Sequence, residues 1–151
     1  MNAVAHRPVK EACADLFFVH IAPDAEILQV HDPRTTAASE SMALQSKLHF
    51  VGLTMKVTKE MPPSIVAYSR SRNILFLIEV AEESGVINPK RKTQLESMFS
   101  RCGAHCEFVT GFQSRDALQE LEEGETSWGT SHWFAAEPSH MIHYGDSRGA
   151  K

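Results

Sequence analysis

The sequence contains two short apolar runs in close succession, Ser64-Ile-Val-Ala-Tyr68 and Ile74-Leu-Phe-Leu-Ile78, joined by the polar connector 69–73. Two runs rich in β-branched and aromatic residues with so short a connector predict a β-hairpin. The second run is apolar at every position, so we expect it to be buried on both faces at the centre of a sheet. Glu79 follows it directly, and the C-terminal end of a buried strand is where open α/β sheets bind ligands.

Further helices and strands are predicted on both sides of this hairpin. Asn88 is a favourable N-cap, and Pro89 suits the first position of a helix. The apolar face of that helix has the spacing i, i+3, i+4, i+7 and stops at a glycine: Leu95, Met98, Phe99, Cys102 and Gly103. The other predicted elements are a helix from Pro8 to Phe17, a strand 26–30, a helix 41–50, strands 107–110, 132–135 and 141–144, and a short acidic helix 116–121. Strands and helices interleave, which predicts the α/β (α+β) class, with a mixed central sheet flanked by helices.

Length and composition are those of an ordinary globular domain. The chain has 151 residues, of which 42% are hydrophobic and 23% are charged. These values predict a single domain over residues 1–151 and exclude wholesale disorder. The longest apolar run is too short to span a bilayer, and the N-terminal region lacks the apolar core of a signal peptide, so we expect a cytoplasmic protein without a membrane partner. Three cysteines do not predict a disulfide framework.

Charge is distributed unevenly along the chain. The formal net charge is −4, but the segment from Lys47 to Lys92 holds eight bases and four acids and is therefore +4. Two of its bases, Lys90 and Arg91, fall in the first turn of the predicted helix, where they oppose the helix dipole. A phosphate bound to the exposed N–H groups of that turn would account for them. The alternative, which spacing alone favours, is that Glu79 ends a strand at the surface and the bases belong to a solvated turn.

Several blocks of the sequence, taken together, resemble the BsuBI/PstI family of type II restriction endonucleases. The blocks are Pro63-Ser64-Ile-Val-Ala-Tyr68, Asn73-Ile-Leu-Phe-Leu-Ile-Glu-Val80, Gly85-Val-Ile-Asn-Pro-Lys-Arg91 and Glu137-Pro-Ser-His-Met-Ile-His143. The resemblance covers most of the chain and roughly the C-terminal catalytic half of the family's enzymes. It implies the restriction-endonuclease-like PD-(D/E)XK fold and Mg²⁺-dependent cleavage of double-stranded DNA, with a homodimer on a palindromic site.

The resemblance also assigns roles to individual residues. Glu79 matches the second carboxylate of the family's site and is the implied Mg²⁺ ligand, and Lys90 is the implied catalytic lysine. Ser64 stands where the family has its metal-binding Asp. One carboxylate is therefore lost, and we expect catalysis to be impaired. Asp15 and Asp32 are the candidates for an acid that takes its place.

We expect DNA to bind to five basic residues of the positive segment, because their charge attracts a polyanion: Arg70, Arg72, Lys90, Arg91 and Lys92. Trp128 and Trp133 would be able to stack on bases, but we expect them in the core. Two other interpretations stay open. One is a non-catalytic descendant of the nuclease fold that binds DNA or a partner protein, and the other is a domain of unrelated function that shares only the fold. An acid within reach of Glu79 would favour the enzyme.

The cysteines and histidines near the end of the predicted helix raise a zinc hypothesis. Cys102, His105 and Cys106 would need His140 or His143 to complete the ligand set. Cys102 already fits the apolar face of the helix, and the two later histidines would point to opposite faces of a strand. We therefore expect these residues in the core or on the surface rather than around a metal.

Overall fold

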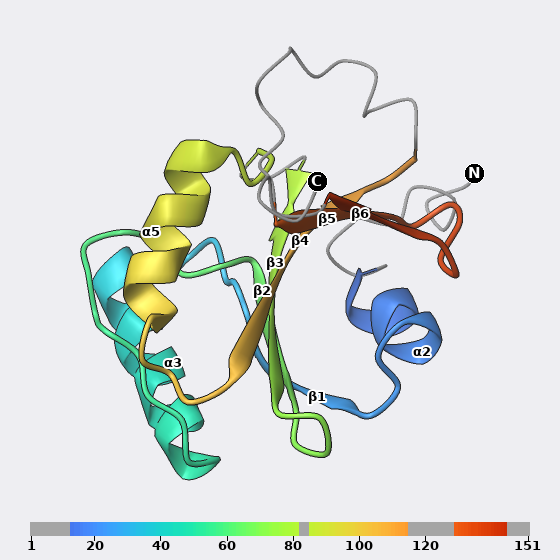
Figure 1. The fold of residues 1–151 in the computed structure, drawn as a ribbon. Coiled ribbons are helices and arrows are strands. Elements are labelled where there is room, and N and C mark those ends of the chain that lie inside the picture. The colour runs from blue at the N-terminus through green and yellow to red at the C-terminus, as the bar shows by residue number, and fades with distance from the viewer. Residues whose placement is uncertain (1–12, 82–84, 115–128, 145–151) are drawn as a thin grey trace, which may run out of the picture.

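The computed structural model describes residues 13–81, 85–114 and 129–144. Within these ranges a mixed six-stranded sheet has the order β1-β2-β3-β4-β5-β6, with helices on both faces (Figure 1). The elements are η2 (Cys13–Phe17), α2 (Phe18–His20), β1 (Ala25–Val30), α3 (Ala37–Phe50), β2 (Ile65–Ser69), β3 (Ile74–Val80), α5 (Pro89–Phe99), β4 (His105–Phe112), β5 (Thr130–Phe134) and β6 (Met141–Tyr144). This architecture confirms the predicted α+β class with a mixed central sheet.

The predicted hairpin forms the middle of the sheet. β2 and β3 pair antiparallel with Ile65 opposite Ile78, and β1 adds antiparallel to β2. β3 then pairs parallel with β4, and β4 with β5, before β6 adds antiparallel. β3 therefore has a neighbour on each side, and its residues 75–80 are all buried, as the uninterrupted apolar run predicts.

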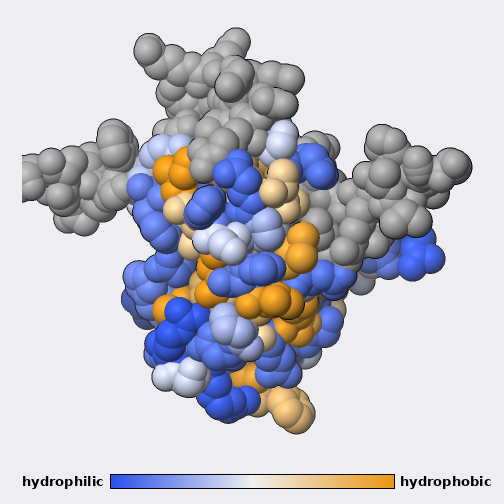
Figure 2. All heavy atoms as spheres, turned by 90° about the vertical axis from the view of Figure 1, so that its right-hand side faces the viewer, coloured by the Kyte–Doolittle hydropathy of each residue, from blue (hydrophilic) through white to orange (hydrophobic). Residues whose placement is uncertain are grey.

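Alternate residues of β3 face two different apolar layers. Leu77 packs in the layer that holds Leu95 of α5, whereas Ile78 packs in the layer that holds Phe17 of η2. Two full helices, α3 and α5, cover the first side of the sheet. The short η2–α2 segment covers the second, where apolar side chains remain visible between polar ones (Figure 2). By the same alternation, Glu79 faces the side of α3 and α5.

Both long helices begin at side-chain caps. Thr36 Oγ1 and Asn88 Oδ1 each accept a hydrogen bond from a backbone N–H in the first turn of the following helix. The Thr36 cap starts α3 four residues earlier than predicted. The prediction that the later helix continues to Cys102 is wrong, because α5 ends at Phe99 and the chain then turns toward β4. Cys102 is nevertheless buried in the same apolar layer, from its place in that turn.

The three later strands lie close to their predicted positions. β4 is longer than the predicted 107–110, β5 begins two residues before 132, and β6 matches its prediction. The predicted acidic helix 116–121, Trp128 and the start of the first helix at Pro8 lie outside the described residues. In the described part of the chain, no helix combines the length and apolar character needed to cross a membrane.

Candidate active site

Polar side chains from three strands, and from the residues that adjoin two more, lie side by side across the sheet and form what we call the polar row: His31, Ser64, Glu79, Thr110 and His132. The His31 N–H donates to the Ser64 carbonyl (2.7 Å), and the hairpin register sets Ser64 beside Glu79. Glu79 pairs with Thr110, and Thr110 pairs with His132. All but His31 are at most 4% exposed. Polar groups buried in this way need partners to offset their desolvation.

Glu79 is the acidic member of the polar row. It lies next to the last residue of β3 and is 1% exposed. Its Oε2 accepts hydrogen bonds from Arg91 Nε (2.8 Å) and Nη2 (2.6 Å), and its Oε1 accepts one from Ser64 Oγ (3.4 Å). The Val80 N–H donates to the same hydroxyl (3.1 Å). The hairpin therefore places the Ser64 hydroxyl directly beside the carboxylate.

Arg91 reaches the polar row from the first turn of α5. Its side chain is 17% exposed. Besides Glu79, the guanidinium donates to the Met61 carbonyl (2.7 Å) and to Gln94 Oε1 (3.1 Å). These contacts hold it in one place, where it compensates the buried carboxylate. Lys90, the predicted catalytic lysine, lies one residue earlier in the same turn and is exposed.

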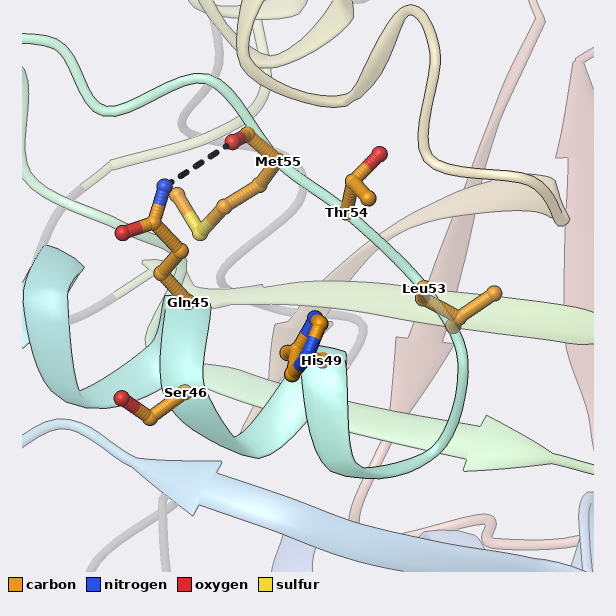
Figure 3. Close-up of a pocket in the computed structure, with 6 residues that line it drawn as sticks. All are labelled: Gln45, Ser46, His49, Leu53, Thr54 and Met55. Atoms are coloured by element: carbon orange, nitrogen blue, oxygen red, sulfur yellow. Dashed lines mark hydrogen bonds between the residues drawn. The ribbon is translucent and has the colours of Figure 1, made fainter.

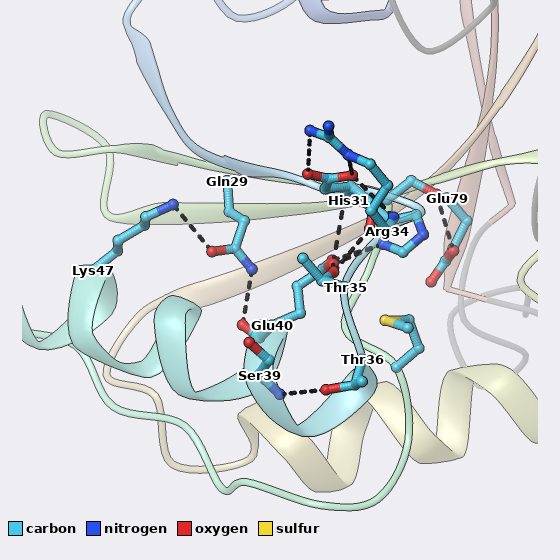
Figure 4. A network of polar contacts seen from close by, with 12 residues as sticks. Gln29, His31, Arg34, Thr35, Thr36, Ser39, Glu40, Lys47 and Glu79 are labelled. Carbon is cyan, nitrogen blue, oxygen red and sulfur yellow. Dashed lines mark hydrogen bonds and ion pairs between the residues drawn. The ribbon is translucent and has the colours of Figure 1, made fainter.

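His31 and Glu40 form a second acid–base pair at this edge, which the sequence analysis did not identify. Glu40, in the first turn of α3, is 4% exposed. Both of its carboxylate oxygens accept from His31 Nδ1 (2.9 and 2.8 Å), and Oε2 also accepts from Thr35 Oγ1 (2.6 Å). Figure 4 shows the His31 ring on the side of Glu40 that faces Glu79. The one local signal was a histidine placed directly after the predicted strand 26–30.

The two acids proposed from sequence to replace the missing Asp lie elsewhere. Asp15 is exposed in η2, the element whose Phe17 packs in the apolar layer on the side of the sheet opposite α5. Asp32 follows the polar row in sequence, but its exposed carboxylate is paired with Arg34 (3.0 Å). Hydrogen bonds from Arg34 lower the pKa of Asp32 to about 2. The structure therefore brings Ser64, Glu79 and Arg91 together without either aspartate side chain.

The basic residues predicted to bind DNA lie near the two ends of β3. Arg70 and Arg72 lie in the turn between β2 and β3, roughly 20 Å from the polar row by strand length. Arg72 is paired with Asp24 (2.7 Å), and hydrogen bonds, above all from Arg72, hold the pKa of Asp24 well below its usual range. Lys92, in contrast, lies near Arg91 in α5, where its Nζ is 3.3 Å from Glu96.

Thr110 and His132 extend the polar row on the side away from β1. Thr110 Oγ1 accepts a hydrogen bond from the Ile87 N–H (3.0 Å), which fixes the approach to α5. Burial lowers the pKa of His132 to about 4, so its ring is neutral at pH 7. The ring packs edge to face against Phe112 and Tyr144, and its Nδ1 has no hydrogen-bond partner in the described residues. No sequence signal marked this histidine, which sits in an otherwise regular strand.

The donor set of the polar row decides whether it fits Mg²⁺, which takes hard oxygen ligands and usually one or two carboxylates. Glu79 supplies the row's carboxylate, but Arg91 holds its Oε2, and Ser64 adds a neutral hydroxyl. Across residues 13–81, 85–114 and 129–144, no three His, Cys, Asp or Glu side chains are close enough to share an ion. In this arrangement a guanidinium already occupies Glu79 Oε2, so Mg²⁺ would have to displace Arg91 from that oxygen or bind through Oε1 and the Ser64 hydroxyl.

The zinc hypothesis lacks a complete ligand set in the same described residues. Cys102 and Cys106 lie close together, with their sulfur atoms 3.6 Å apart. His105, however, is directed to Glu107 (2.6 Å). A tetrahedral zinc site needs four ligands, or three and a water.

A separate cavity of about 370 Å³ lies between α3 and the segment that follows it (Figure 3). Its lining residues are Gln45, Ser46, His49, Leu53, Thr54 and Met55. Gln45 Nε2 donates to the Met55 carbonyl across it (3.4 Å). None of its lining residues belongs to the polar row. We therefore place the candidate site at the row and not in this cavity.

Comparisons with known proteins agree with the resemblance seen in the sequence. The model of the BsuBI/PstI restriction endonuclease domain family matches residues 1–147. A curated relative, the type II restriction enzyme BsuBI of Bacillus subtilis, is 34% identical over 86 residues, which are 57% of this chain and 27% of the relative. The solved structure of the SdaI restriction endonuclease is 26% identical with a TM-score of 0.73, over 91% of this chain and 42% of that one. The chain thus spans less than half the length of either protein.

Proposed function

Because the chain belongs to the BsuBI/PstI restriction endonuclease family, we propose that it is the nuclease domain of a type II restriction-type endonuclease acting on double-stranded DNA. The observation that carries this proposal is the pairing of Ser64 with Glu79 at the end of a buried hairpin. Glu79 is 1% exposed. An acidic residue is rarely buried so completely, so apolar packing does not account for its presence in the strand. We propose that Glu79 is the second carboxylate of the family's site, as the sequence resemblance implies.

The proposed cofactor is Mg²⁺, with Glu79 as the residue that would bind it. Carboxylate oxygen is the ligand that this ion prefers, and the ion would polarise the scissile phosphate. Lys90, in the first turn of α5, is the proposed lysine that stabilises negative charge there. Because Arg91 holds Glu79 and Ser64 is neutral, we expect weak Mg²⁺ binding and slow cleavage by the wild-type protein.

Incubation of plasmid DNA with an excess of the purified protein tests this function. We expect slow nicking with Mg²⁺ or Mn²⁺, and none with EDTA or in the variant Glu79→Gln. Rapid cleavage by the wild type would contradict the proposed impairment and show that another acid completes the site. Cleavage that persists in Glu79→Gln would remove Glu79 from the mechanism.

A non-catalytic DNA-binding descendant of the fold is the second candidate. The observation that favours it is the Arg91–Glu79 ion pair, in which an arginine satisfies the carboxylate without a metal. A protein of this kind would bind duplex DNA without cutting it. The DNA would stay intact with the wild type and also with a variant that restores the second carboxylate.

Salt dependence provides a prediction for the DNA contacts. Each phosphate neutralised on duplex DNA contributes about 0.9 to the slope of log affinity against log salt. We therefore expect a steep slope for the wild type, smaller by about 1 in Lys90→Ala. Lys56→Ala is the matched control, because Lys56 is also exposed but hydrogen-bonds through its backbone to Met98 near the opposite end of α5. Fluorescence anisotropy with a labelled duplex measures these slopes, and equal slopes in both variants would contradict the predicted contact.

The proposed assembly is a homodimer that acts in the cytoplasm. An enzyme that cuts both strands of a palindromic site needs two active sites related by a two-fold axis. Light scattering in the presence of a palindromic duplex distinguishes two protein chains per duplex from one.

A further inference from the structure

Two cysteines beyond the C-terminal end of α5 form a close thiol pair that the proposed nuclease function does not use. The sulfur atoms of Cys102 and Cys106 are 3.6 Å apart, and both residues are free thiols. Cys102 is 3% exposed in the apolar layer beneath α5, whereas Cys106, on β4, is partly exposed.

The turn that connects the two cysteines is fixed by neighbouring segments. Gly103 has a φ of +100°, a conformation that favours glycine and lets the chain reverse. Asn73 Nδ2 donates to the Gly103 carbonyl (3.1 Å), and the His105 N–H donates to the Asn73 carbonyl (3.0 Å). The Thr54 N–H donates to the Cys102 carbonyl (3.1 Å). Because both sides of the turn are hydrogen-bonded, the sulfurs are held close together.

The environment of the pair favours thiol exchange. The hydrogen bond between the sulfurs lowers the pKa of Cys102 and raises that of Cys106, so the thiolate character lies on the buried Cys102, which is placed to accept the proton of Cys106. Cys106 also borders a cavity of about 350 Å³. The other lining residues are Glu96, Phe99, Ser100 and Phe108. A small molecule in this cavity would contact the Cys106 sulfur before the buried Cys102.

We propose that Cys102 and Cys106 are a modification site at which a small-molecule disulfide of the glutathione class converts the two thiols into an intramolecular disulfide. Cys106, the more accessible sulfur, passes its proton to the Cys102 thiolate and attacks one sulfur of the small disulfide, which forms a mixed disulfide and releases one thiol. Cys102 then attacks the Cys106 sulfur, which forms the protein disulfide and releases the second thiol. The protein loses two electrons and two protons, and the two released thiols carry them. The second step is intramolecular between groups already held together, so the mixed disulfide does not accumulate.

Redox titration with mass spectrometry tests this proposal. The intact chain is equilibrated in buffers with an increasing ratio of oxidised to reduced glutathione, then alkylated and mapped by peptide masses. We expect Cys102 and Cys106 to lose alkylation together, with the loss of two hydrogens and without bound glutathione. In Cys102→Ser, where the second attack is removed, glutathione on Cys106 should rise by roughly tenfold or more. In Cys106→Ser, the buried Cys102 should stay reduced.

Two results would overturn the proposal. One is a stable glutathione adduct on Cys106 of the wild type, which would show that Cys102 does not complete the exchange. The other is a wild type that keeps both thiols in a buffer in which Cys102→Ser already carries the adduct. Circular dichroism confirms that each variant is folded. If Cys102→Ser does not fold, Cys106→Ser alone carries the test, and Cys102 should stay reduced in it.

Discussion

The variant Arg91→Met is expected to lose about 3–5 kcal/mol of the free energy of unfolding, because it leaves a buried carboxylate without its countercharge. Glu79 is 1% exposed, and Arg91 donates two hydrogen bonds to one of its oxygens. Methionine keeps much of the length and apolar stem of the arginine, so packing losses are kept small. Urea denaturation at pH 7 measures the change.

Two further variants show whether this loss comes from the buried charge of Glu79. Arg34→Met removes the partner of Asp32 in an exposed pair, with 88% and 40% of the two side chains accessible, and should cost less than about 1 kcal/mol. The double variant Arg91→Met with Glu79→Gln should recover a large part of the loss, because it removes both charges. A loss below about 1 kcal/mol in Arg91→Met alone would show that other donors satisfy Glu79.

The central part of the fold could be predicted because its signals are local. The apolar run Ile74–Ile78 carries both its strand propensity and its burial on two faces in five consecutive residues, and the structure places it in the middle of the sheet. Asn88 and Pro89, two consecutive residues, likewise mark the start of α5. The end of α5 could not be predicted, because Cys102 keeps the helical spacing of the apolar face while its backbone already belongs to a turn.

The residues of the candidate site that could be predicted are those marked by the pattern of a single strand or helix. Glu79 stands at the end of a buried strand, and the helical spacing from Arg91 to Leu95 places that arginine on the buried face of α5. Lys90, one position earlier, points away from this face and is exposed. The contact between His31 and Glu40 depends on how α3 packs beside β1. No periodicity in either segment carries that information.

Ser64→Asp is expected to convert the polar row into a site that binds a divalent cation. Ser64 Oγ lies 3.4 Å from Glu79 Oε1, so the substitution adds a second carboxylate directly beside the first. Without a cation the two negative charges repel each other, and the free energy of unfolding should fall. Mg²⁺ should reverse this loss, by about 2.7 kcal/mol at a concentration of 100 times the dissociation constant. Urea denaturation with and without Mg²⁺ measures both effects.

The matched control is Ser64→Asn, which has nearly the same shape as the aspartate variant but adds no charge. We expect Mg²⁺ to stabilise neither this variant nor the wild type appreciably. A similar Mg²⁺ effect in all three proteins would mean that the ion binds elsewhere on the chain. Isothermal titration then gives the stoichiometry, which should be one high-affinity ion per chain in Ser64→Asp alone.

The same variant separates the two proposed functions. If the chain is a nuclease weakened at one position, Ser64→Asp should gain Mg²⁺-dependent cleavage of plasmid DNA, and the added change Glu79→Gln should abolish it. The gain is expected because the ion then has two hard carboxylate ligands and no longer depends on Glu79 alone, whose Oε2 is engaged by Arg91. Mg²⁺ binding without cleavage, in a variant that still binds duplex DNA, would favour the non-catalytic descendant. In that case the ion pair with Arg91 serves to compensate the buried charge of Glu79, and no reaction requires Arg91 to leave Glu79.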